Sequence, residues 1–220
     1  SSRVSLSRIL PLLTNLGVEV TDERTFELRR IPAAHGLDRA ADRAAGSDDG
    51  GESAETRVVH LYDVGVRAAS EDDWARGPEG QDPEGAVRNF SEAFAAVWNG
   101  TAESDGLDRL VLGAGMTPRE VTILRTLAAY LRQTAPYSRG YIEDALRENH
   151  KIARLLLDLF AARFDPDLHP APGDDAGAVT DERRAAQEAL LERLTQRLDA
   201  VASLDQDRIL SAFRDIILAT

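Results

Sequence analysis

Residues 106–166 constrain the fold most, because they read as a series of amphipathic helices with clear start and stop signals. Thr117-Pro118-Arg119-Glu120 is typical of a helix start, since threonine can cap the first turn and the glutamate can return a hydrogen bond to it. Pro136 ends that helix, and Ser138 can cap the next one. Apolar residues recur three or four positions apart throughout, so we predict several packed helices.

The first hundred residues mix helix and strand patterns. Residues 6–16 carry apolar side chains at helical spacing, and Gly17 follows where a helix end often needs a left-handed residue. Alternation near 17–30 and 57–67 predicts two strands, and a helix is predicted at 86–99. The second strand is expected to place Val58, His60 and Tyr62 on one face and Val59, Leu61 and Asp63 on the other.

Two segments, 33–56 and 70–85, are rich in glycine and acidic residues and are predicted to be loops. Residues 165–179 are predicted to be a linker, followed by a long helix from Thr180 and a last helix that reaches the end of the chain. The predicted fold class is therefore α+β, with a small α/β module at 1–100 and a predominantly helical domain at 101–220. The last helix shows no stop signal at Ala219–Thr220, so we expect a segment of a longer polypeptide.

Composition excludes several classes of function. A net charge of −12 argues against nucleic-acid binding, which requires clustered positive charge. No apolar run reaches the length of roughly 18 to 20 residues that a membrane span needs, and the start does not resemble a signal peptide. The chain has no cysteine, so it can form neither a disulfide nor a thiolate metal site. We expect a cytoplasmic protein with neither a nucleic-acid nor a membrane partner.

Candidate catalytic groups are few. The four histidines show no spacing that would place two imidazoles on one helical face, and Lys151 is the only lysine. Gly113-Ala114-Gly115 superficially suggests a phosphate-binding loop, but it follows an apolar helix, so a turn between helices is the better interpretation. We therefore predict no catalytic, cofactor-binding or metal-ligating residue in this chain.

Charged side chains in the helical region are expected to be solvated. The close carboxylates Asp105 and Asp108, and likewise Asp205 and Asp207, are interpreted as chance neighbours on exposed faces of an acid-rich chain. The arginines are expected on solvated faces with intrahelical ion pairs, such as Glu143 with Arg147. The alternative is an arginine cluster that binds an anionic ligand or pairs across an interface. These arginines are Arg109, Arg119, Arg125, Arg132, Arg139, Arg147, Arg154 and Arg163.

Several clusters along the chain resemble the large, multidomain NAD-dependent glutamate dehydrogenases. They are LSRILPLLTNLGVEV (6–20) with DER (22–24), HLYD (60–63), DGLDRLVL (105–112), LR (124–125) with YLRQ (130–133), Ser138 with YIE (141–143), and FAARFDP (160–166). The resemblance covers most of the chain apart from the two predicted loops. It implies a partial ACT-like module followed by helices that lead into a catalytic region outside these residues.

The resemblance implies a parent enzyme that oxidises L-glutamate to 2-oxoglutarate and ammonia with NAD. This segment would be an inactive structural or regulatory part, with no cofactor of its own. Its partners would be the rest of the polypeptide and other subunits of a homo-oligomer. Two alternatives remain: an ACT-like amino-acid sensor, with residues 16–18 as the junction to test, and a free-standing helical interaction protein.

Overall fold

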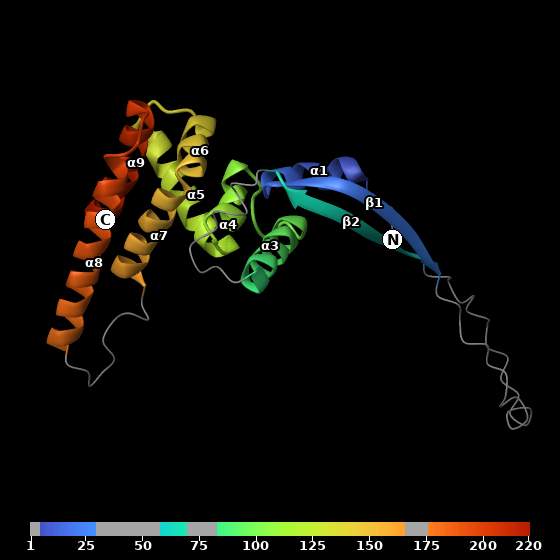
Figure 1. The fold of residues 1–220 in the computed structure, drawn as a ribbon, viewed down its shortest axis with the longest axis horizontal. Helices are drawn as coiled ribbons and strands as arrows, with labels where there is room; N and C mark the ends of the chain where they lie inside the picture. Colours follow the sequence, from blue (N-terminus) through green and yellow to red (C-terminus); the bar gives the residue numbers. More distant parts are fainter. Residues whose placement is uncertain (1–4, 30–57, 70–82, 166–175) are drawn as a thin grey trace, which may run out of the picture.

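The computed structural model describes residues 5–29, 58–69, 83–165 and 176–220. Within these ranges a two-stranded sheet is followed by a series of helices (Figure 1), which confirms the predicted α+β class. The elements are α1 (Leu6–Asn15), β1 (Val18–Arg29), β2 (Val58–Ala68), α3 (Pro83–Trp98), the 3-10 helix η1 (Gly106–Arg109), α4 (Leu110–Gly113), α5 (Pro118–Thr134), α6 (Arg139–Glu148), α7 (His150–Phe164), α8 (Ala176–Leu198) and α9 (Leu204–Ala219).

Two helices begin earlier than the sequence predicted. Helix α3 begins at Pro83, inside the predicted loop 70–85, because proline suits a first turn and Glu84 complements the positive helix end. Helix α8 begins at Ala176 rather than Thr180, inside the predicted linker. The predicted loop 33–56, residues 70–82 of the second loop and residues 166–175 of the linker lie outside the described residues.

The two strands pair in antiparallel register, from Val18 opposite Ala68 to Arg29 opposite Val58. The predicted alternation along β2 is confirmed, since Val58, His60 and Tyr62 are half-buried while Val59 and Leu61 are about half exposed. Helices α1 and α3 pack at one end of the sheet, and the other end extends beyond them (Figure 1).

Gly17 makes the turn from α1 into β1 with a φ of +82°, as its position predicted. We expect Gly17→Ala to lower the free energy of unfolding by about 1–2 kcal/mol, because side chains are strained in the left-handed region. Its added Cβ would lie 3.4 Å from Cγ of Arg109, an ordinary contact, so backbone strain dominates. Urea unfolding measures the change.

The control for that substitution is Gly140→Ala in α6, where nothing lies within 4 Å of an added Cβ. Alanine is the better helix former by about 1 kcal/mol, so this variant should be at least as stable as the parent chain. Equal losses in the two variants would contradict the role given to the turn.

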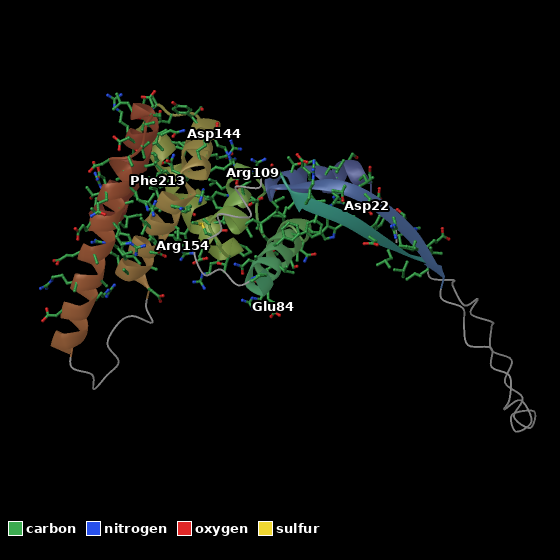
Figure 2. The ribbon with its side chains drawn as sticks, viewed as in Figure 1. Asp22, Glu84, Arg109, Asp144, Arg154 and Phe213 are labelled. Carbon is green, nitrogen blue, oxygen red and sulfur yellow. The ribbon has the colours of Figure 1, made fainter. Side chains whose placement is uncertain are left out.

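The sheet region and the helices share their buried cores. Leu16, directly after α1, and Ala93 of α3 belong to the large core that also includes η1 and helices α4 to α9, among them the fully buried Phe213 of α9 (Figure 2). Conversely, Leu112 of α4 belongs to the smaller core beneath the sheet, beside Ile9 and Leu13. In the described ranges, no helix combines the length and the apolar character that crossing a bilayer requires.

Candidate functional site

The most unusual site is a cluster of buried charges around η1. Asp105 and Asp108 are only 8% and 5% exposed, so the prediction that they lie on solvated faces is wrong. Asp105 caps η1 by accepting a 3.0 Å hydrogen bond from the Leu107 N–H, and Asp108 Oδ2 accepts one of 3.3 Å from the Asp105 N–H. The two carboxylates thus form a capping box at the start of a short helix.

Arg125 of α5 lies between these two carboxylates. Its Nε and Nη2 lie 2.7 Å and 3.0 Å from the two oxygens of Asp105, and Nη2 also lies 2.9 Å from Asp108 Oδ1. The arginine side chain is only 13% exposed, so its predicted place on a solvated face is also wrong. A planar guanidinium can bind two acceptors at once, which allows one cation to compensate both buried anions.

A second arginine extends the cluster to α6. Arg139 bonds both to Asp105 Oδ2 and, at 2.6 Å, to Glu143 Oε1. Glu143 Oε2 accepts a 3.2 Å hydrogen bond from the Gly106 N–H, and a Cβ at Gly106 would lie 2.7 Å from that oxygen. The predicted partner of Glu143 is therefore wrong, because Arg147 pairs with Asp144 at 2.7 Å instead.

The same network reaches back to the sheet region. Asn15, the last residue of α1, donates a 2.9 Å hydrogen bond to the Ser104 hydroxyl, which donates another of 2.9 Å to Asp108 Oδ2. Polar contacts thus run without a break from α1 through η1 to α5 and α6. We call these residues the joint cluster: Asn15, Ser104, Asp105, Asp108, Arg125, Arg139 and Glu143.

Burial affects the two aspartates differently. Burial tends to raise the pKa of Asp105, but the hydrogen bonds and charge of Arg125, together with the Leu107 N–H and Arg139, outweigh it and hold that pKa below its ordinary value. Burial does raise the pKa of Asp108, because the Ser104 hydrogen bond and the Arg125 charge do not offset it and Asp105 repels a second negative charge.

The geometry favours a structural role over a chemical one. The aspartate side chains are 6% and 7% exposed, and their oxygens are occupied by arginine, backbone and serine donors. A general acid or base must reach the proton that it transfers, and these carboxylates are covered by their partners. What the arrangement can do is to fix the relative positions of four elements.

Other predicted features can be placed in the structure. Gly113-Ala114-Gly115 does form a turn between α4 and α5, and Gly115 has a φ of +63°. The capping box of Thr117 with Glu120 and the cap by Ser138 are confirmed. Asp205 and Asp207 lie in the first turn of α9. Two of the four histidines, His35 and His169, lie outside the described residues.

The predicted absence of a metal site stays a prediction. The part of the chain that the structure describes contains no group of three or more His, Asp or Glu side chains able to hold a metal ion. In the joint cluster, Arg125 and Arg139 already pair with the carboxylates and would repel a cation. Its only signal in the sequence was the Asp-x-x-Asp spacing at η1, which matches a capping box.

Comparison with known proteins relates the chain to one family. Residues 1–36 match the domain family described as "Glutamate dehydrogenase, ACT3 domain", and residues 102–166 match "Glutamate dehydrogenase, helical motif 3". The second match includes every residue of the joint cluster except Asn15, which lies within the first.

Similar proteins include three NAD-specific glutamate dehydrogenases. The protein from Mycobacterium tuberculosis is 34% identical over 217 residues, and those from Halomonas elongata and Pseudomonas aeruginosa are 31% identical over 218 and 220 residues. These alignments cover 98–99% of this chain but only 11% of each relative's length. The chain therefore corresponds, over nearly its whole length, to one segment of the large NAD-specific glutamate dehydrogenase family.

Proposed function

We propose that this chain is a non-catalytic, structural and regulatory segment of a large NAD-dependent glutamate dehydrogenase. The parent enzyme would oxidise L-glutamate to 2-oxoglutarate and ammonia in the cytoplasm, with NAD bound elsewhere in the polypeptide. The segment would position the catalytic region and contribute to contacts with other subunits of a homo-oligomer.

The joint cluster is the observation that carries this proposal. Its carboxylates and arginines pair with one another, and through Ser104 and Asn15 the cluster connects α1 at the sheet to α5 and α6 of the helical region. Breaking a buried ion pair leaves an uncompensated charge, so such a cluster strongly favours one arrangement of the elements that it joins. A rigid connection of this kind suits a segment that holds the catalytic region of a large subunit in a fixed position.

The alternative of an amino-acid sensor at residues 16–18 gains no support from the geometry. Leu16 and Val18 are 1% and 4% exposed, and the aliphatic stem of Arg109 lies against Gly17. Arg109 occupies the junction between the sheet and the helices (Figure 2). The site where a ligand was expected is therefore filled by the chain's own side chains.

The non-catalytic role predicts that the purified 220-residue chain has no glutamate dehydrogenase activity. NADH formation from L-glutamate and NAD should stay at the level of a protein-free blank, because Asp105, Asp108 and Arg125 are covered by one another and by neighbouring donors. A full-length NAD-specific glutamate dehydrogenase, assayed in parallel, serves as the positive control. NADH production that rises in proportion to the amount of chain would refute the proposal.

A further inference from the structure

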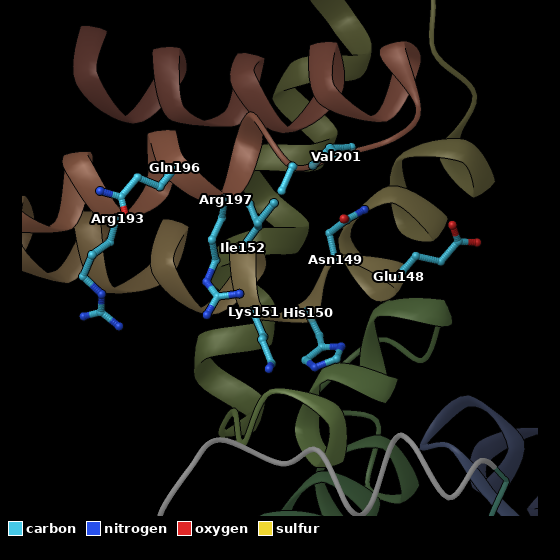
Figure 3. A pocket seen from close by; sticks show the side chains of 10 residues that line it. Glu148, Asn149, His150, Lys151, Ile152, Arg193, Gln196, Arg197 and Val201 are labelled. Atoms are coloured by element: carbon cyan, nitrogen blue, oxygen red, sulfur yellow. The ribbon is translucent and has the colours of Figure 1, made fainter.

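A cleft of about 730 Å³ lies between the start of α7 and the last turns of α8 (Figure 3). This volume falls within the range of sites that bind small molecules. Three of its side chains carry a positive charge at neutral pH: Lys151 of α7, and Arg193 and Arg197 of α8. The remaining lining residues are Glu148, Asn149, His150, Ile152, Gln196, Ala200 and Val201.

The cationic groups point to one side of the cleft. Figure 3 shows the ends of Lys151, Arg193 and Arg197 extending in the same direction, with the ring of His150 beside them. The carboxylate of Glu148 lies at the opposite end, where it accepts a 2.6 Å hydrogen bond from Nε2 of Gln206. The acidic side chain of the lining is therefore already engaged away from the three cations.

No ion pair between described residues neutralises these charges, and only Arg197, in the last turn of α8, is partly offset by a negative helix end. None of the ion pairs between described residues involves Lys151, Arg193 or Arg197, although the chain as a whole has a net charge of −12. Three exposed cations on one side of a cleft therefore present a positive surface that can attract an anion.

The start of α7 adds to this positive potential. Its first turn contains no acidic residue, and Asn149 makes no side-chain cap but donates to Ala145 O at 2.9 Å and to Gln206 Oε1 at 3.1 Å. Backbone N–H groups at a helix start attract anions, phosphate groups in particular.

We propose that this cleft is a binding site for a small phosphate-bearing anion, held by Lys151, Arg193 and Arg197. Three positive charges on one side of the cleft match a ligand with at least two negative charges, and guanidinium groups bind phosphate oxygens in pairs. The concave shape favours a small molecule over an acidic polypeptide, which would bind across a flatter surface. The site goes beyond the structural role proposed above and does not depend on it.

Isothermal titration of inorganic pyrophosphate into the 220-residue chain, at fixed ionic strength, tests the site. We expect saturable binding that Lys151→Gln and Arg197→Gln each weaken by about tenfold, since each removes a charge-assisted contact. The control is Arg184→Gln, which removes the same charge from α8 at an exposed pair with Asp181 and should change the affinity less than about twofold. Circular dichroism verifies that each variant keeps its helices.

Four outcomes would overturn the proposal. The first is the absence of saturable binding up to about 10 mM pyrophosphate. The second is equal weakening by Arg184→Gln, which would indicate non-specific attraction to α8. The third is binding of glutarate as tight as that of pyrophosphate, which would show that the site does not select phosphate. The fourth is binding of poly-glutamate without binding of pyrophosphate, which would identify a surface for an acidic polypeptide.

Discussion

Replacing Arg125 with methionine is expected to lower the free energy of unfolding by about 3–5 kcal/mol, the loss typical when one partner of a buried ion pair is removed. Methionine keeps much of the aliphatic stem, so the change tests the charge more than the packing. Without the guanidinium, Asp105 and Asp108 would stay buried with Arg139 as the remaining cation, and of these two carboxylates Arg139 bonds only to Asp105. Urea unfolding followed by circular dichroism measures the loss.

Arg132→Met provides the matched control, because Arg132 lies on the same helix but is exposed. Substitutions of exposed side chains usually change stability by less than about 0.5 kcal/mol. If the two variants lost equal stability, the joint cluster would not hold the elements together as we describe.

The two aspartates should respond differently to neutralisation. Asp105→Asn is expected to cost about 3 kcal/mol at pH 7, because Asp105 bonds to both arginines and its lowered pKa shows that the fold favours its charged form. Asp108→Asn is expected to cost only about 1 kcal/mol, because the raised pKa of Asp108 shows that the fold disfavours its charge.

The contributions of Asp105 and Asp108 to the free energy of unfolding should change in opposite directions with pH. The pKa of Asp105 is lower in the folded than in the unfolded state, so its contribution to stability is present above about pH 4 and is lost as the pH falls through the folded value. The pKa of Asp108 is higher in the folded state, so its contribution is present below about pH 4 and is lost as the pH rises through the folded value.

Urea unfolding of the parent chain and both variants at pH 7 and near pH 3 measures this difference. The cost of Asp105→Asn should shrink on acidification, whereas the cost of Asp108→Asn should stay the same or grow. If the stability cost of both substitutions changed with pH in the same way, Asp105 and Asp108 would not differ in the charge state that the fold favours, which would contradict our description of the joint cluster.

Local signals in the sequence predicted most of the secondary structure. The capping box at Thr117, the cap at Ser138 and the turn at Gly17 each depend on neighbouring residues, so a single sequence contains the necessary information. The alternation along β2 also divided its residues correctly between the two faces, although it did not indicate which face would be covered. The early starts of α3 and α8 were missed because glycine and acidic residues near them resemble loop composition.

The joint cluster could not be predicted in the same way. Arg125 is 20 residues from Asp105, and Arg139 is 34 residues from it, so no helical or strand period connects them. Arg125 follows the buried Leu124 on α5, at the border of the apolar face, where sequence patterns suggest a solvated position. With 38 acidic residues in the chain, composition also does not distinguish Asp105 and Asp108 from acidic residues on exposed faces.

The measurement that most directly tests the central claim uses Arg125→Met in the full-length dehydrogenase that we propose as the parent. Thermal unfolding and the KM values for L-glutamate and NAD are determined together for the parent enzyme and the variant. A structural joint predicts a lower unfolding temperature, with both KM values of the folded enzyme unchanged within about twofold. An unchanged unfolding temperature with a lower kcat and a shifted pH profile would instead place the cluster in the chemistry and contradict the account.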